Sequence, residues 1–373
     1  MPQDIPVTPA DLTPSLLTEL VETLRPGVRV EDVDVISAKN YGDADNTISV
    51  STSSQVKIRV RYGGSGADSL PRDLLVKMSF PEIRGASNPD LDAEFDNEVN
   101  FYNRIRPELD IETPLGLGGR FDPDSGRFVL LLEDLSVRSP HINSMADADN
   151  LTIVEACLDT YAKLHAGFWQ SPRFQGDLAW VQNQVDGPLE DMFVRFIRDH
   201  IVKELNREAF KREFVEELGT TEEALYTGCR VLKLHQATLP QTFLHGDAHL
   251  ANTYYLPDGG GGLLDWQVSA RGYLMHDIGY FLQSAFSVEK RRKHERDMLA
   301  YYREQLCRNG VKDAPSLEAL WLEYRRSMIY GFYYGWLTAP RENYGWEVMV
   351  LGNHRTKAAC QDHDTLQLID ALR

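Results

Sequence analysis

The feature that most limits the possible folds of this chain is a change of hydrophobic pattern near residue 135. Upstream of it, short runs rich in apolar residues are bounded by turn residues, and residues 56–62 alternate Val or Ile with Lys or Arg, which is typical of strands. Downstream, apolar residues recur every three or four positions, which predicts helices. The expected strands cover 33–38, 47–51, 56–62, 74–80 and 128–132, and the helices expected among them cover 11–24 and 91–105. The sequence therefore predicts an α+β protein, with a strand-rich domain over 1–135 and a larger, mainly helical domain over 136–373.

Two segments of the helical half stand out. Residues 189–218 have a continuous amphipathic pattern and are predicted to form one long helix. Residues 253–256 and 262–266 do not fit a helix, and they flank the turn sequence Pro257-Asp-Gly-Gly-Gly-Gly262. We expect them to form a short hairpin, in which the glycine run makes a turn and does not cradle a phosphate.

The charge of the chain excludes some partners and leaves others open. Its 373 residues include 39 Lys and Arg against 56 Asp and Glu, a net charge of −17, which disfavours nucleic-acid binding. A nucleotide is still compatible, because one Lys and a metal ion can balance its charge. The N-terminus has no signal-peptide pattern, no apolar run is long enough to cross a bilayer, and the four scattered cysteines have no metal-binding spacing. We expect a cytoplasmic protein with no membrane partner, and no pattern predicts its oligomeric state.

The residues with the clearest chemical pattern are Asp247, Asn252 and Asp265. Asn252 follows Asp247 by five positions, and Asp265 comes at the end of the predicted hairpin. Phosphoryl transfer needs a carboxylate to orient the attacking hydroxyl and accept its proton. It also needs an amide oxygen and a second carboxylate to hold Mg²⁺ against the phosphates. The same Asp-to-Asn spacing, followed by a metal-binding Asp, marks the catalytic loop of kinases.

Phosphoryl transfer by this route also needs a Lys for the phosphates of ATP and an acid that holds the Lys. Lys77 lies in the predicted strand over 74–80, and Glu98 lies on the helix that follows. A single strand Lys or helix Glu is usually a surface residue. Their order ahead of Asp247 and Asp265 favours the functional interpretation.

The segment His245-Gly-Asp-x-His-x-x-Asn252, followed by Leu-Leu-Asp265-Trp-Gln, resembles the aminoglycoside phosphotransferase and choline kinase superfamily. Further segments resemble its ecdysteroid kinase-like (CHK kinase-like) branch. These segments are Asp45-Asn46-x-x-Ser49, Glu98-Val-Asn-Phe-Tyr102, Leu132-Glu-Asp-Leu135 and Leu164-His-Ala166. The ordered set spans residues 33 to about 285, which is most of the chain.

This resemblance implies a bilobal, protein-kinase-like fold whose N-terminal lobe is an antiparallel sheet with helices and whose C-terminal lobe is helical. It implies an ATP- and Mg²⁺-dependent kinase of a small hydroxylated molecule, in which Asp247 is the base and Asn252 and Asp265 hold the metal. The residues it places around ATP are Lys77, Glu98, Gly42, Asn46, Glu133 and Leu135. Adenine would pair with the backbone near Glu133–Leu135, so the side chains of Glu133 and Asp134 need not take part. The loop over 41–46 lacks the pattern G-x-G-x-x-G and carries two aspartates.

Several roles stay open at the level of sequence. Asp277 matches a further acid of the family pattern, and we interpret it as a support for the catalytic segment. His245 is expected to pack and hydrogen-bond, and His165 to be a core histidine. A second interpretation combines His245, Asp247 and His249 in a metal phosphohydrolase site, and a third is a nucleotide-binding scaffold without catalysis.

The acceptor is the least determined feature. The aromatic run over 330–336 is expected to pack in the core, with an acceptor pocket as the alternative. Acidic runs such as those at 215–218 and 221–223 are usually solvated helix faces, although they suit a cationic acceptor. By resemblance alone we favour a hydroxylated metabolite that is sterol-like or an amino alcohol.

Overall fold

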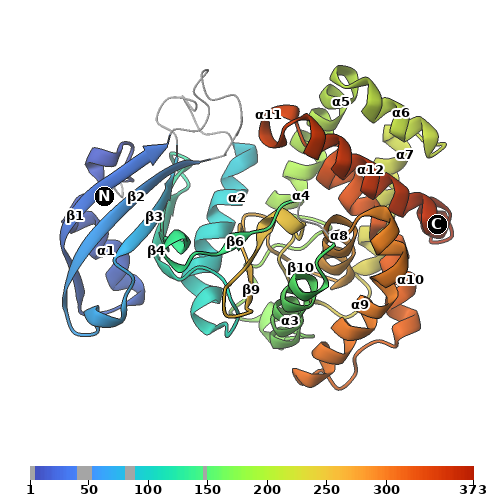
Figure 1. Ribbon diagram of the computed structural model, residues 1–373. Coiled ribbons are helices and arrows are strands. Elements are labelled where there is room, and N and C mark those ends of the chain that lie inside the picture. Colours follow the sequence, from blue (N-terminus) through green and yellow to red (C-terminus); the bar gives the residue numbers. More distant parts are fainter. Residues whose placement is uncertain (1–4, 40–52, 80–88, 146–148) are drawn as a thin grey trace. The chain divides into compact units, whose positions relative to one another are not determined.

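The computed structural model describes residues 5–39, 53–79, 89–145 and 149–373. The chain forms two compact units. The first comprises Met1–Leu109 and Thr113–Pro140, and the second comprises Asp110–Glu112 and His141–Arg373. An antiparallel sheet dominates the first unit and helices dominate the second (Figure 1). The predicted α+β class is confirmed.

The first unit is built on a five-stranded sheet in which every neighbouring pair is antiparallel. Its strand order is β1-β2-β3-β5-β4. The strands are β1 (Val28–Lys39), β2 (Ser54–Gly64), β3 (Asp73–Met78), β4 (Gly116–Asp122) and β5 (Arg127–Glu133). The strands predicted at 33–38, 56–62, 74–80 and 128–132 match β1, β2, β3 and β5, whereas the segment 47–51 lies outside the described residues.

A helix packs on each face of this sheet because strand side chains alternate between the two faces. Along β5, Val129 and Leu131 point to the core that contains α1 (Pro14–Leu24). Phe128 points the other way and stacks on Phe95 of α2 (Pro89–Asn100), with ring centroids 4.3 Å apart. α2 continues through a π-helical turn to Ile105. At β5 the sheet is thus buried on both faces, and the alternation of side chains along the strand decides which residues meet α2.

Eleven helices and five short strands make up the regular structure of the described part of the second unit. The helices are α3 (Leu151–Gly167), α4 (Pro188–Met192), α5 (Arg198–Arg207), α6 (Ala209–Glu217), α7 (Glu222–Gln236), α8 (Met275–Ala285), α9 (Val288–Arg308), α10 (Leu317–Tyr330), α11 (Arg341–Tyr344), α12 (Trp346–Asp362) and α13 (Thr365–Asp370). The strands are β6 (His141–Ile142), β7 (Thr242–Leu244), β8 (Thr253–Tyr255), β9 (Gly261–Leu263) and β10 (Ala270–Gly272). All residues of α8 are buried, so this helix forms the centre of the unit. No helix within the described ranges is long and apolar enough to span a bilayer.

The predicted hairpin is present as β8 and β9, which pair antiparallel beside β6. Gly262 in β9 faces Tyr254, and a Cβ atom at this glycine would lie 2.1 Å from the tyrosine ring. The amide of Leu256 donates to the carbonyl oxygen of Gly260, which closes the turn. The glycine run therefore serves the turn and close packing, as predicted from its flanking strands.

The single long helix predicted over 189–218 is wrong. The chain is helical in α4, in a π-helical turn and in α5, but Glu208 is extended, with φ −112° and ψ 106°, and α6 starts anew. The break lets the buried Lys211 donate to Glu204 and to the carbonyl oxygens of Leu337 and Ala339. These carbonyl groups lie 126 and 128 residues away along the chain, so periodicity could not reveal the break.

Candidate active site

The loop that contains Asp247 begins directly after β7. The side chain of Asp277 fixes the start of this loop through hydrogen bonds. Asp277 lies in the first turn of α8 and is fully buried. Its carboxylate accepts the backbone N–H of His245 at 2.7 Å and that of Gly246 at 2.9 Å. Gly246 has φ +89°, and a Cβ atom there would lie 2.0 Å from the carbonyl oxygen of Val268. The sharp turn before Asp247 thus needs both the glycine and the buried acid, which agrees with the structural interpretation of Asp277.

Asp277 is itself oriented by a second pair of buried side chains. Nε2 of His165 lies 3.1 Å from the Asp277 carboxylate, and Nδ1 of the same ring lies 2.7 Å from the Tyr302 hydroxyl. Burial raises the pKa of Asp277, but the hydrogen bond from His165 and the nearby imidazoles lower it more, so the net pKa lies below its ordinary value. Asp277 is therefore an ionised acceptor at neutral pH. His165 is the core histidine expected from the sequence.

Asp247 and Asn252 are in direct contact. The amide nitrogen of Asn252 donates to the backbone oxygen and to the carboxylate of Asp247, both at 2.9 Å. The Asp247 side chain is 40% exposed, so it is fixed but open to a substrate. Burial raises its pKa, but the neighbouring His249 ring and the bond from Asn252 lower it more, and the net pKa is lowered. The arrangement supplies an ionised carboxylate that can accept a proton from a hydroxyl group.

Two hydrogen bonds connect this loop to the segment that ends in Asp265. Nε2 of the buried His245 lies 2.7 Å from the carbonyl oxygen of Leu264, and the amide of Leu264 donates to the carbonyl oxygen of Asn252 at 2.8 Å. The His245 ring packs on Trp266 at 4.7 Å. Burial lowers the pKa of His245, which favours the neutral ring. His245 thus orients the loop, as predicted.

Asn252 and Asp265 carry the kinds of oxygen atom that Mg²⁺ prefers, and their role as metal ligands stays a prediction. Both amide hydrogens of Asn252 point to Asp247, which leaves its side-chain oxygen as the atom that can ligate. Asp265 has a left-handed backbone with φ +64°, which is rare for a residue other than glycine and often marks a functional position. Hard cations such as Mg²⁺ prefer carboxylate and amide oxygens.

The phosphohydrolase alternative needs several ligating side chains to converge on one ion. The rings of His245 and of the nearby His276 lie 2.7 and 3.0 Å from the carbonyl oxygens of Leu264 and Gly246. His249, the other histidine of this alternative, lies beside Asp247, with Nε2 3.5 Å from its carboxylate. Among the residues that the structure describes, no group of three or more His, Cys, Asp or Glu side chains is placed to hold a metal ion. The contacts of His245 and His276 therefore favour an orienting role for these two residues over metal ligation.

In the first unit, Lys77 and Glu98 form a buried ion pair. Alternation along β3 places Lys77 on the face covered by α2, and Nζ lies 2.7 Å from both carboxylate oxygens of Glu98. Lys77 is 8% exposed and Glu98 is 1% exposed. The acid holds the ammonium in one position, which is the arrangement that phosphate binding by a strand Lys requires.

Replacing Lys77 by Met is expected to lower kcat/KM for ATP about 100-fold, because a positive charge that would face the phosphates is lost. It should also lower the free energy of unfolding by about 3–5 kcal/mol, since the buried charge of Glu98 would lose the ammonium group that balances it. The double variant Lys77→Met, Glu98→Gln should recover most of the stability but not the activity. Steady-state kinetics and urea unfolding measure the two effects. Lys57→Met is the matched control, because Lys57 also pairs with an acid, Asp134, but is 41% exposed. A double variant with normal KM for ATP would remove Lys77 from the site.

The remaining residues proposed around ATP have less defined roles. The Glu133 carboxylate accepts the amide of Leu115 at 3.0 Å and pairs with Arg138 at 3.2 Å. Asp134 caps the turn that begins at Leu135 and pairs with Lys57. Both acidic side chains thus have structural partners, and a contact between adenine and the backbone near Leu135 stays a prediction. Gly42 and Asn46 lie outside the described residues.

The sequence interpretation missed Tyr280 and Tyr344, two aromatic residues in a group of rings beside His249, although it named the run over 330–336 that contains Trp336. The His249 ring lies 5.8 Å from Tyr280 and 6.5 Å from Trp336, and Trp336 lies 5.5 Å from Tyr344. Nε2 of His249 lies 3.5 Å from the Asp247 carboxylate, so these ring contacts lead from that carboxylate to Tyr280 and, through Trp336, to Tyr344. Tyr280 follows Asp277 by three positions on α8, so the sequence alone could have placed it on the same face of the helix as Asp277. No local pattern pointed to Tyr344.

The aromatic run over 330–336 mostly packs in the core, as expected. Phe332 and Tyr333 are fully buried, and Tyr330 and Trp336 are almost so. Tyr344, which is 37% exposed, is the more accessible ring near Asp247.

The sequence model of the phosphotransferase enzyme family, APH, matches residues 65–315. This range covers most of the chain and includes Lys77, Asp247 and Asp265. The chain therefore belongs to this phosphotransferase family. The match is to the family as a whole and does not single out the ecdysteroid kinase-like branch.

Solved structures with similar folds include kinases of several acceptors. A choline kinase from Cryptosporidium parvum Iowa II has 13% identity, a TM-score of 0.48, and coverage of 92% of this chain and 90% of its own. An ethanolamine kinase from Plasmodium vivax has 12% identity, a TM-score of 0.45, and coverage of 90% and 82%. A macrolide 2′-phosphotransferase from Brachybacterium faecium has 14% identity, a TM-score of 0.42, and coverage of 84% and 89%. Sequence identities and TM-scores this low give no information about the acceptor of this chain. No curated protein matches it.

Proposed function

We propose that this protein is an ATP-dependent kinase that transfers the γ-phosphate to a hydroxyl group of a small molecule. The observation that carries the proposal is the loop fixed by Asp277, which presents the ionised Asp247 in contact with Asn252. This geometry occurs in a member of a phosphotransferase family. Residues 1–135 would bind the nucleotide, with Lys77 and Glu98 at its phosphates, and residues 136–373 would supply the catalytic loop and the acceptor site.

Asp247 orients the acceptor hydroxyl and takes its proton. The hydroxyl oxygen forms the new bond to the γ-phosphorus while the bond to the β-phosphate oxygen breaks, and ADP leaves. Asn252 limits the rotation of the carboxylate, so its free oxygen can point to the substrate. Asn252 and Asp265 would hold Mg²⁺, which neutralises charge on the phosphates when it is bound.

Asp265→Asn is expected to raise the Mg²⁺ concentration that gives half-maximal ATP turnover by about tenfold or more, because a neutral amide is a weaker ligand for a hard cation. Asn tolerates left-handed backbone, so the variant should fold. A Mg²⁺ titration of ATP turnover measures the change. The control is Asp364→Asn, since Asp364 is an exposed aspartate that also has positive φ, at 51°. An unchanged Mg²⁺ requirement would remove Asp265 from the metal site.

The acceptor site is proposed to lie over Asp247, beside Tyr280 and Tyr344. Aromatic rings next to a carboxylate suit an acceptor with an apolar or cationic body. We propose a hydroxylated metabolite, either sterol-like or an amino alcohol.

A transfer screen with purified protein, ATP and Mg²⁺ tests the proposal over aminoglycosides, amino alcohols, sterols and hydroxyacyl thioesters. Phosphorylation of one class above the rate of ATP hydrolysis is the expected result. ATP binding with neither transfer nor hydrolysis would instead support a non-catalytic scaffold.

A further inference from the structure

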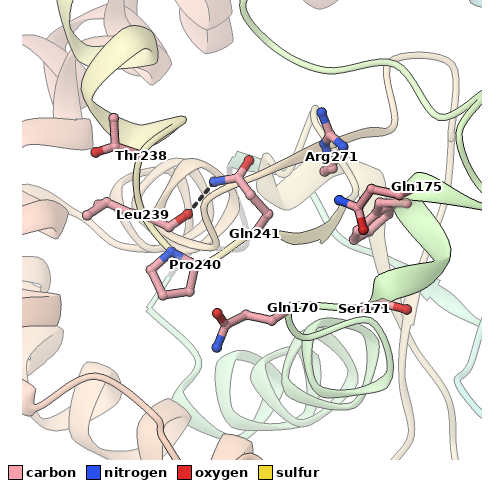
Figure 2. Close-up of a pocket in the computed structure, with 9 residues that line it drawn as sticks. Gln170, Ser171, Gln175, Thr238, Leu239, Pro240, Gln241 and Arg271 are labelled. Carbon is pink, nitrogen blue, oxygen red and sulfur yellow. Dashed lines mark hydrogen bonds between the residues drawn. The ribbon is translucent and has the colours of Figure 1, made fainter.

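A polar pocket in the second unit contains none of the residues assigned to catalysis. Its volume is about 370 Å³, which is enough for a small metabolite. The walls come from the segment after α3, from the loop between α7 and β7, and from β10 (Figure 2). The lining residues are Gln170, Ser171, Phe174, Gln175, Thr238, Leu239, Pro240, Gln241 and Arg271.

The charge of the pocket comes from Arg271, which is the one ionisable residue of its lining. Its guanidinium lies 5.7 Å from the centre of the Phe174 ring, which supports it from one side. Nε of Arg271 is buried without an acceptor, and within the described ranges no carboxylate pairs with this side chain. Arg173, which precedes Phe174 in the chain and does not line the pocket, is instead paired with Asp177 at 2.6 Å. A guanidinium without a counter-ion in a small polar pocket suits an oxyanion, which it can bind through two N–H groups.

Hydrogen bonds within the protein hold two glutamine side chains of the pocket in place before any ligand binds. The amide nitrogen of Gln241 donates to the carbonyl oxygens of Gln236 and Leu239, at 2.9 and 2.7 Å. The amide nitrogen of Gln170 donates to Asp313 at 2.6 Å. In each case the amide oxygen is left as the group that can accept a hydrogen bond from a ligand. Gln170 also has a left-handed backbone, with φ 48°, which often marks a functional position.

We propose that this pocket is a second binding site for a small molecule that carries an oxyanion and hydrogen-bond donors. Arg271 would bind the oxyanion, and the amide oxygens of Gln170 and Gln241, which line the same pocket, would accept hydrogen bonds from hydroxyl or ammonium groups of the ligand. The site is separate from Asp247, because β7 runs between Gln241 and His245, a separation of about 13 Å along an extended chain.

Isothermal titration calorimetry of the nucleotide-free protein tests this site, and it needs no phosphate transfer. The probes are inorganic phosphate, O-phosphoethanolamine and malate. O-phosphoethanolamine and malate carry donors beside a phosphate or a carboxylate, so they distinguish the two kinds of oxyanion, and inorganic phosphate shows what the anion alone contributes. We expect one of the two larger probes to bind at millimolar concentration or below, and more tightly than phosphate.

Arg271→Gln should weaken that binding about tenfold or more, because the charged fork is lost. Gln175→Glu adds a negative charge at an exposed position of the lining and should weaken binding without disturbing the fold. Arg173→Gln removes the same charge nearby and should leave binding unchanged. The proposal is overturned if no probe binds up to millimolar concentration, or if binding survives both Arg271→Gln and Gln175→Glu.

Discussion

Asp247→Asn is expected to lower the rate of phosphate transfer by about 100- to 10,000-fold, the usual contribution of a general base. The amide keeps an oxygen that can accept the hydrogen bond from Asn252, so the loop should hold its shape. It cannot take the proton of an acceptor hydroxyl. ATP affinity should stay within about threefold of the wild-type value, because Asp247 is not proposed to touch the nucleotide base or to hold the metal.

The measurement is single-turnover transfer with saturating ATP, together with an independent ATP-binding titration. Asp258→Asn is the control. It makes the same replacement of a carboxylate by an amide, but Asp258 lies in the exposed turn of the neighbouring hairpin. Wild-type turnover by Asp247→Asn would end the catalytic assignment. Loss of ATP binding together with turnover would instead assign Asp247 to nucleotide binding.

Asp277→Ala is expected to lower the free energy of unfolding by about 3–5 kcal/mol and to abolish most transfer. The substitution removes the acceptor of the His245 and Gly246 amides and leaves the buried His165 ring without its carboxylate partner. The loop that carries Asp247 would lose its anchor. Urea unfolding measures the first effect. Asp297→Ala on the exposed face of α9 is the control, and it should change stability by less than about 0.5 kcal/mol.

The contribution of Asp277 to stability should depend on pH in a defined direction. Its pKa in the folded state is lowered, so the folded protein favours the ionised form more than the unfolded chain does. The contribution is complete above the unfolded pKa of about 3.9 and is lost as the pH falls through the lower, folded pKa. The stability difference between wild type and Asp277→Ala should therefore be constant from about pH 8 to pH 5 and narrow below about pH 4. A difference that narrows between pH 8 and pH 5 would show that the carboxyl is not held ionised.

The sequence could predict those parts of this protein that depend on a local residue pattern or on the order of motifs along the chain. Alternation along β2 and the short apolar runs of β3 and β5 predicted these strands, and turn residues beside β8 and β9 predicted the hairpin. The spacing of Asp247, Asn252 and Asp265 predicted a candidate catalytic segment, and the structure shows Asn252 in contact with Asp247, because these two residues lie within one loop. The order of Lys77 and Glu98 predicted a pair that the structure shows in contact.

Other parts depend on chain segments that meet only after folding. His165 and Asp277 are separated by 112 residues, and His165 and Tyr302 by 137, yet their contacts position the catalytic loop. The break of the helix after α5 depends on carbonyl groups of the segment before α11. The position of Tyr344 near Asp247 likewise follows from the packing of that segment.

By itself the sequence determined the α+β class and the candidate reactive side chains, because these follow from local spacing. Only the tertiary structure decided which groups fix the reactive loop and which rings lie beside it. Buried polar atoms must find partners wherever the packed chain brings them. For Asp277 that requirement joined α3, α8 and α9 to one carboxylate, a result that no single stretch of sequence contains.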